Sequence, residues 1–456
     1  MIGIKGVGMT MLARFFAGNN IEVIGSDTAE VFMTDEPLRK AGVKILENFA
    51  PENIPKDADL IIYSTAYNAE RNAEVAAALA GKVRTLTYAA AMGEVFNQKY
   101  GIAVIGSHGK TTTTAWLGFV LNRAGLAPNA MVGSIVPQWD GPSLVSGSDI
   151  LIIEADEYQN KLQYFNPRAV LLNNIDYDHP DFFPTPQEYK NVFIEFIKKI
   201  PAKGFLIANF DDPIIRSVAG VNCRGKVVSY GIENQADYAA YDLRSFDGRQ
   251  FFKVRTRNED GAGESAPSEL GDFSIQLAGK HNISNALAVI AAAIELETPL
   301  AAIREHLGQF TGTARRMQRM GEYNGALIYD DYAHHPAEIK ATLSGLRQLY
   351  PKNKLTVVFH PHTFTRTKAL LGGFAESFDS ADKVIILDIY GSAREAQGGV
   401  HSRDLVAKMK NKNFELIYLP ALADAEAHLR EELTRDEVLV LMGAGDVFRV
   451  GEMLLQ

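Results

Sequence analysis

The feature that most restricts the fold is a recurring pattern of short Ile, Val and Leu runs that end abruptly in polar or glycine-bearing segments. Continuous apolar runs without alternation are typical of strands buried on both faces, as in parallel sheets covered by helices. These runs are residues 60–63, 102–105, 150–153, 169–172, 355–359, 384–387 and 438–441. Stretches with helical character lie between them, at residues 113–124, 187–200, 283–296, 337–349 and 404–410. The sequence therefore predicts an α/β fold.

The length of 456 residues predicts about three domains, at roughly 150 residues each. We expect a first block at residues 1–98 with a Rossmann-like fold, whose opening residues are a strand already under way. A middle block, residues 99–312, is expected to be a P-loop ATPase-like domain with a mostly parallel sheet. A third block, residues 313–456, is expected to be a Rossmann-like α/β domain. Residues 257–272, rich in Gly, Glu and Ser, are expected to form a surface loop.

Composition excludes several classes of protein. The net charge of −9 argues against non-specific nucleic-acid binding. The sequence contains no run of 18 or more apolar residues, so we expect no stable membrane insertion. The single cysteine, Cys223, excludes an intramolecular disulfide and a cysteine-rich zinc site, and we expect it to be a small packing residue. The N-terminus lacks the basic and apolar segments of a signal peptide, so a cytoplasmic location is expected.

The strongest local motif is a phosphate loop at residues 106–113, between a predicted strand and a predicted helix. Its glycines would let backbone N–H groups close on phosphate oxygens, and the helix N-terminus adds positive potential. Lys110 would reach the outer phosphates and the Thr111 hydroxyl would bind Mg²⁺. The match to the common P-loop pattern is incomplete, because Val104 stands at its first glycine position. The residues expected to bind ATP here are Gly106, Ser107, His108, Gly109, Lys110, Thr111 and Thr112.

Carboxylates and a histidine follow the next strands, and these groups are reasonable magnesium ligands or supports for them. They are Glu154, Asp156, Asp178, His179 and Asp181.

A second glycine loop, residues 3–9, precedes a helix, and Ser26 and Asp27 end the next strand about 20 residues on. This resembles a dinucleotide fingerprint, although its glycine spacing departs from G-x-G-x-x-G. The loop leaves open either a dinucleotide-dependent oxidoreductase or a site for another diphosphate-bearing ligand.

Together the motifs resemble the Mur ligase family, whose members build the peptide of bacterial peptidoglycan. The resemblance rests on the phosphate loop and on residues 154–157, 178–181, 281–286, 315–316 and 331–336, which follow the family's order and spacing. Further segments, residues 4–10, 360–367, 388–395 and 442–446, favour the member that joins L-alanine to UDP-N-acetylmuramate. The resemblance implies ATP and Mg²⁺ as cofactors and an acyl-phosphate intermediate. Oligomeric state cannot be read from the sequence.

The resemblance also implies roles for individual residues. Lys110, His179, Arg316 and Arg366 would be catalytic, and the metal ligands would be Thr111, Glu154 and His179. The adenine and phosphate contacts outside the loop would be His281, Asn282, Asn285, Arg316 and Asp331. The substrate-binding residues would be Gly6, Gly8, Ser64, Thr65, His335 and Arg366.

Several of these residues have structural alternatives. Asn282 and Asn285 could be helix caps, and Arg315 could pair with a surface acid. His334 and His335 could be turn residues before Pro336, and Arg366 could be solvated.

Three positions depart from the family's pattern. Phe193 stands where sibling ligases carry a carbamylated lysine, so the metal site should be built without that ligand. Thr363 replaces an arginine of many relatives. The first strand is shorter than in many relatives, which could loosen the sugar-nucleotide domain.

Three alternatives to the alanine ligase remain. One is a ligase that attaches a preformed tripeptide to the same sugar, which would need a wider acceptor pocket. The second is the oxidoreductase, which leaves the phosphate loop unexplained. The third is a catalytically silent nucleotide-binding protein, which the retained Lys110, Glu154, His179 and Arg316 oppose.

Overall fold

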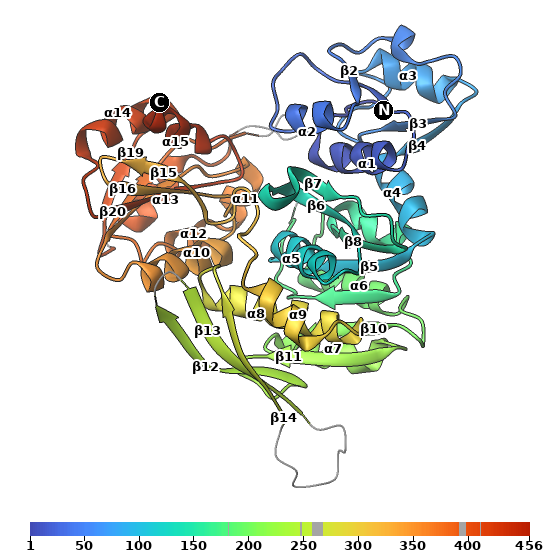
Figure 1. Cartoon of the computed structure of the whole chain (residues 1–456). Helices are drawn as coiled ribbons and strands as arrows, with labels where there is room; N and C mark the ends of the chain where they lie inside the picture. The colour runs from blue at the N-terminus through green and yellow to red at the C-terminus, as the bar shows by residue number, and fades with distance from the viewer. Residues whose placement is uncertain (181, 247–248, 258–267, 392–397, 411) are drawn as a thin grey trace.

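A ten-stranded sheet forms the centre of the molecule, and two smaller α/β layers flank it (Figure 1). This computed structural model describes residues 1–456 except 181, 247–248, 258–267, 392–397 and 411. The predicted α/β class is confirmed. Asp181 and residues 392–395, which belong to the motifs named above, lie outside the described residues.

In the first block, two parallel pairs of short strands share the strand layer. Ile2 forms parallel bridges to both Ser26 and Tyr63 and so joins the pairs. The expected opening strand is therefore wrong in extent, because only Ile2 makes strand contacts before the glycine loop begins at Gly3, where φ is +80°. The elements are α1 (Val7–Gly18), β1 (Ile24–Ser26), α2 (Asp35–Lys40), β2 (Lys44–Leu46), η1 (Pro51–Asn53), β3 (Leu60–Tyr63), α3 (Ala73–Ala80), β4 (Arg84–Thr87) and α4 (Tyr88–Asn97).

The middle block contains the large sheet, in the order β14-β13-β12-β11-β10-β9-β5-β8-β6-β7. Its first half comprises β5 (Tyr100–Ile105), α5 (Lys110–Arg123), β6 (Asn129–Val136), η2 (Pro137–Trp139), β7 (Gly141–Leu144), β8 (Ile150–Glu154), η3 (Tyr158–Tyr164) and β9 (Ala169–Leu172). Its second half comprises α6 (Pro186–Ile197), β10 (Phe205–Asn209), α7 (Pro213–Asn222), β11 (Lys226–Gly231), β12 (Tyr238–Phe246), β13 (Arg249–Thr256), β14 (Ser268–Ile275), α8 (Lys280–Glu295) and α9 (Leu300–Leu307).

The sheet of the middle block is mostly parallel, as predicted, and its antiparallel pairs lie at the two edges. Most of the loop expected over residues 257–272 lies outside the described residues, at 258–267. The expectation is wrong at its C-terminal end, because residues 268–272 pair with β13 as part of β14. A polar strand at a sheet edge needs no apolar run, which is why composition did not indicate it. Cys223 is half-buried at the end of α7, as a packing residue would be.

The third block has a six-stranded sheet in the order β15-β16-β20-β17-β18-β19, parallel except for the β15–β16 hairpin. Its elements are β15 (Gln318–Tyr323), β16 (Ala326–Asp331), α10 (Pro336–Leu349), β17 (Lys354–Phe359), α11 (Phe364–Ala369), α12 (Leu371–Ala375), β18 (Lys383–Ile386), α13 (Ser402–Met409), β19 (Glu415–Tyr418), α14 (Leu422–Glu432), β20 (Glu437–Met442) and α15 (Phe448–Leu455). Across the part of the chain that the structure describes, no helix is long and apolar enough to cross a membrane.

Candidate functional site

The phosphate loop follows β5, which lies between β8 and β9 in the middle of the large sheet. Gly106 and Gly109 have φ angles of +134° and +77°, which side chains rarely tolerate. Both are also crowded, because a Cβ atom on Gly109 would lie 2.7 Å from Asn285 Oδ1 and one on Gly106 would lie 3.0 Å from the Asn174 carbonyl oxygen. The loop therefore needs glycine at both positions, and it leads directly into α5 at Lys110.

Lys110 is folded back over its own loop. Its Nζ donates to the Gly106 carbonyl and lies 3.0 Å from Glu157 Oε2, while Tyr189 Oη donates to the other oxygen of Glu157 at 2.9 Å. Burial disfavours the charged amine, but Glu157, Asp156 and Glu154 outweigh it and raise the pKa of Lys110. The side chain thus holds a positive charge in a nearly closed site. Glu157, 1% exposed, received no role from the sequence although it ends the same acidic segment as Glu154.

The predicted metal ligands fall into two neighbouring groups. Thr111 Oγ1 donates to Glu154 Oε1 at 2.8 Å, so these two lie together as expected. His179 lies apart from them and instead has its Nε2 3.9 Å from Glu157 Oε1. Donor atoms of Asp156, Glu157 and His179 all lie within 4.8 Å of one another. Phe193 is buried in the apolar layer beneath, so it cannot take a place among these donors.

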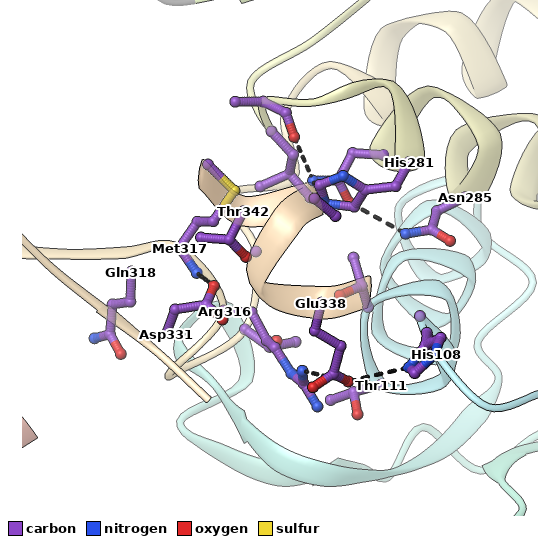
Figure 2. A pocket seen from close by; sticks show the side chains of 18 of the residues that line it. His108, Thr111, His281, Asn285, Arg316, Met317, Gln318, Asp331, Glu338 and Thr342 are labelled. Atoms are coloured by element: carbon purple, nitrogen blue, oxygen red, sulfur yellow. Dashed lines mark hydrogen bonds and ion pairs between the residues drawn. The ribbon is translucent and has the colours of Figure 1, made fainter. Parts of the chain in front are cut away.

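A cavity of about 680 Å³ opens beside the loop between the middle and third blocks (Figure 2). The predicted ATP residues in its lining are His108, Gly109, Thr111, Thr112, His281, Asn282, Asn285, Arg316 and Asp331. Gly106, Ser107 and Lys110 complete the loop at its edge but do not belong to the lining. The cavity therefore brings together residues more than 200 positions apart in the chain.

One wall of the cavity is the start of α8. Asn282 lies inside this helix, whose N-cap is Gly279, so the alternative of an asparagine N-cap is wrong. The Asn282 amide donates to the Ala278 carbonyl at 2.7 Å, and Asn285 donates to Asn282 Oδ1 at 3.1 Å. Burial, with a smaller effect of Arg316, lowers the pKa of His281 to about 4. This wall is therefore neutral and offers amide and imidazole groups rather than charges.

The opposite wall carries Asp331 and Arg316. Both oxygens of Asp331 accept backbone hydrogen bonds, from Met317 at 2.7 Å and from Ala333 at 2.8 Å. Burial raises its pKa to about 6, against the opposing effect of Arg316. The Arg316 guanidinium lies 5.2 Å from the centroid of the Tyr332 ring and faces the cavity in Figure 2.

Neighbouring Arg315 pairs at 3.0 Å with Asp330, which is 2% exposed. Its partner is therefore a buried acid and not a surface one.

Arg366 crosses from the third block to the middle block. Its guanidinium lies 3.5 Å from Asp178 Oδ1 and the side chain is 12% exposed, so the solvated alternative is wrong. Burial would raise the pKa of Asp178, but His179 and Arg366 outweigh this and lower it strongly. His335 caps α10, since its ring accepts the Ala337 N–H, and the ring centroid lies 5.0 Å from that of His108. It is therefore a capping residue at the interface between the blocks.

The candidates in the first block lie apart from the large cavity. Gly6 is the N-cap of α1, and a Cβ on Gly8 would lie 2.9 Å from the Tyr88 ring. The glycine loop lies against the turn after β3, because a Cβ on Gly3 would lie 3.0 Å from Ser64 Cβ. Asp27 accepts the Lys5 backbone N–H at 2.7 Å. The lining of the large cavity includes none of Gly6, Gly8, Ser64 and Thr65.

Family models match almost the whole chain. The Mur ligase family catalytic domain matches residues 1–100, the Mur ligase middle domain residues 104–293, and the Mur ligase glutamate ligase domain residues 315–445. The chain is 35% identical to the UDP-N-acetylmuramate–L-alanine ligase of Desulfitobacterium hafniense over 456 residues, covering 100% of this chain and 98% of the relative. It is 36% identical to the ligase of the same name from Acetivibrio thermocellus, covering 100% and 95%.

Solved structures show the same fold. The UDP-N-acetylmuramate-alanine ligase of Thermotoga maritima matches with a TM-score of 0.81 at 23% identity, covering 100% of this chain and 97% of that one. A murein peptide ligase of Psychrobacter arcticus matches with a TM-score of 0.72 at 24% identity and the same coverage. With its motifs, its family-model matches and its full-length relatives in agreement, the chain belongs to the Mur ligase family.

Proposed function

We propose that this protein is an ATP-dependent ligase that joins L-alanine to UDP-N-acetylmuramate, a step of peptidoglycan precursor synthesis. The observation that carries the proposal is the cavity between two blocks. The phosphate loop forms one side, with Thr111 in the lining and Lys110 at its edge, and Arg316 and Asp331 approach from the other. Full-length relatives bearing the name of this activity support the choice of substrates.

The reaction has two steps. A carboxylate oxygen of the muramyl group attacks the γ-phosphorus of ATP, the bond to the bridging oxygen breaks, and ADP leaves. The alanine amine, once deprotonated, then attacks the acyl carbon, and the tetrahedral intermediate expels phosphate to leave an amide. Lys110 and Arg316 would stabilise the charge on the transferring phosphoryl group, which depends mainly on positioning and electrostatics.

The donor atoms present suit Mg²⁺, the second cofactor of the proposal. The Thr111 hydroxyl and the Glu154 carboxylate are hard oxygen donors 2.8 Å apart, of the kind magnesium prefers. They would hold one ion, and His179 with its neighbouring carboxylates would hold another. When bound, the ions would neutralise phosphate charge. Lys110, now paired with Glu157, would meanwhile turn towards the phosphates.

We assign the three blocks to separate tasks, with boundaries near residues 98/99 and 312/313. Each block has its own strand layer, and the separate family-model matches to residues 1–100, 104–293 and 315–445 support a division into three. Gly6, Gly8, Ser64 and Thr65 would bind the sugar nucleotide. Arg366 and His335 would also contact the substrate, and the His335 ring lies beside that of His108. A reaction that consumes ATP is expected in the cytoplasm.

The test is phosphate release by the purified protein with ATP, Mg²⁺ and UDP-N-acetylmuramate, with each amino acid or the tripeptide as acceptor. Release that depends on L-alanine is the expected result. Release with the tripeptide alone would show that the acceptor is the tripeptide and not L-alanine. If no acceptor gave phosphate release and the protein oxidised NAD(P)H, the protein would be an oxidoreductase and not a ligase.

Replacing the loop lysine gives the sharpest single variant. Lys110→Ala should reduce phosphate release by at least about 10³-fold, because an electrostatic stabiliser of the transferring group is lost. Its far-ultraviolet circular dichroism should stay unchanged. Lys203→Ala, at an exposed position of the same block, is the matched control and should retain full activity. Near-normal turnover of Lys110→Ala would refute the role given to the phosphate loop.

A further inference from the structure

Glu338, in the first turn of α10, lies where the third block meets the phosphate loop (Figure 2). Its side chain is 12% exposed, and neither the motifs nor the proposed chemistry gives it a role. Its two oxygens face different parts of the molecule. Oε2 accepts the His334 backbone N–H at 3.0 Å within the third block, whereas Oε1 lies 3.3 Å from His108 Nδ1 of the phosphate loop and 3.7 Å from Arg316.

The orientation of this carboxylate is fixed from its own block. Glu338 is the third residue of a 14-residue helix that begins at Pro336 behind the His335 cap. A carboxylate in the first turn is favoured there by the exposed N–H groups and the helix dipole. His334 contributes a second contact, because its Nδ1 lies 3.3 Å from Oε2. The helix terminus therefore holds Oε2, and Oε1 is presented across the interface.

His108 of the phosphate loop is the first group that Glu338 Oε1 contacts across the interface. The His108 backbone N–H donates to Asn174 Oδ1 at 2.7 Å, and its ring Nε2 lies 3.1 Å from Asp176 Oδ2. Burial disfavours the charged ring, but hydrogen bonds to Asp176 and Glu338 outweigh it and raise the pKa of His108 to about 9. At neutral pH the imidazolium thus bridges a carboxylate of the middle block and a carboxylate of the third block.

Arg316 is the second group that Glu338 Oε1 contacts. The residue lies in the connection between the two blocks, lines the cavity and stacks on Tyr332. The Arg316 side chain is 30% exposed, and its NH1 lies 3.7 Å from Glu338 Oε1. Burial disfavours its charge, but nearby acids outweigh this and raise the pKa of this arginine. Glu338 has the largest electrostatic effect among them, ahead of Asp331 and Glu154.

We propose that Glu338 is a positioning residue that docks the third block on the phosphate loop. By joining His108 to Arg316, it holds the arginine where the terminal phosphate of ATP arrives. This inference rests on the proposed function only for the identity of the nucleotide. The contact across the blocks exists without it.

The test uses Glu338→Gln, which keeps the size of the side chain but removes its charge. Without nucleotide, small-angle scattering of the full-length variant should give a larger radius of gyration than wild type. The KM for ATP should rise about tenfold while kcat changes much less, because the loss falls on assembly of the site. Glu432→Gln, an exposed acid on α14 of the same block, is the matched control and should match wild type.

His108→Gln removes the partner on the other side and must reproduce the same open profile. In the double variant, the rise in KM should be at least about threefold smaller than the product of the single rises, because both remove one contact. An unchanged radius of gyration with KM within twofold of wild type would overturn the proposal, as would strictly multiplicative effects. If wild type itself releases no phosphate, the proposed function fails, and the scattering comparison alone decides the docking role.

Discussion

The middle block meets its two neighbours through interfaces of opposite chemistry. Towards the first block the interface is apolar: α1 and α4 share one buried cluster with the inner face of the large sheet. Phe96 of α4 packs edge-on against Phe165 at 5.3 Å, and a Cβ on Gly101 would lie 2.5 Å from the Phe96 ring. Towards the third block the interface contains charged contacts, which join His108 to Glu338 and Arg366 to Asp178. It also contains a neutral contact, since a Cβ on Gly345 of α10 would lie 3.3 Å from Gly279 Cα.

The difference indicates which blocks can move. Separating the apolar interface would expose hydrocarbon to water, which costs free energy in proportion to area and has no compensating partner. Separating the charged interface returns ions to water, and a nucleotide with its metal ions offers new partners for the same groups. We therefore expect the first and middle blocks to stay together while the third block docks and releases around the nucleotide.

The largest expected effect is at the apolar interface. Phe96→Ala should lower the free energy of unfolding by about 3–5 kcal/mol, because a fully buried ring is lost and a cavity is left. Both tryptophans of the chain, Trp116 and Trp139, lie in the middle block. Their fluorescence during urea unfolding therefore reports whether loss of a first-block ring destabilises the neighbouring sheet.

Leu79→Ala, at a side chain of α3 that is 51% exposed, is the control and should change stability by less than about 0.5 kcal/mol. If Phe96→Ala left the urea unfolding curve measured by tryptophan fluorescence unchanged, the first and middle blocks would unfold independently. The apolar interface would then not hold these two blocks together.

The second effect concerns the charged interface and pH. Against the effect of burial, hydrogen bonds to Asp176 and Glu338 raise the pKa of His108 to about 9. Only the part caused by Glu338 favours docking, because Asp176 lies in the same block as His108 and stays beside the ring when the blocks separate. This part is present at neutral pH and is lost as pH rises through 9. The full rise from 6.5, at about 1.4 kcal/mol per pH unit, limits it to less than roughly 3 kcal/mol. Nucleotide-free protein should therefore expand between pH 6.5 and 9.5, measured by scattering.

His108→Gln should abolish this dependence. Asp331, whose pKa is raised to about 6, titrates below the chosen window, and the Met1 amine lies in the first block, away from the contact. The groups that face His108 are Asp176, Glu338 and His335. A wild-type profile that is flat from pH 6.5 to 9.5 would show that this ring does not hold the blocks together.

The local pattern predicted much of the fold and of the phosphate loop. Each apolar run named above coincides with a strand, namely β3, β5, β8, β9, β17, β18 and β20. This follows because burial on both faces requires apolar side chains whatever the partners are. The need for glycine at Gly106 and Gly109 could also be predicted, because their positive φ angles are a local property of the loop.

Contacts between distant residues were not readable. Glu338 lies 230 residues from His108, and nothing in the spacing of either motif joins them. Arg366 was open to a solvated interpretation for the same reason, because its partner Asp178 belongs to another block. Glu157 was visible as an acidic residue, but its contact with Lys110 depends on how the lysine folds back.

Thr363 shows a further limit of the sequence. The family pattern indicated only a missing arginine there. The structure shows a threonine with φ of +67° at the N-cap of α11, where its N–H donates to the Tyr390 carbonyl at 2.9 Å. A β-branched residue rarely adopts this conformation, so no propensity would have predicted it.

The smallest effect separates the centre of the apolar interface from its polar rim. Arg14 of α1 donates to the Asp140 carbonyl at 2.8 Å across the same interface, near the exposed pair of Lys40 and Asp140. Solvent screens such contacts, so Arg14→Met, which keeps the apolar stem, should cost about 1 kcal/mol or less in the urea experiment. A cost equal to that of Phe96→Ala would mean that polar contacts hold the first block in place. The contrast between an apolar, fixed interface and a charged, releasable one would then be lost.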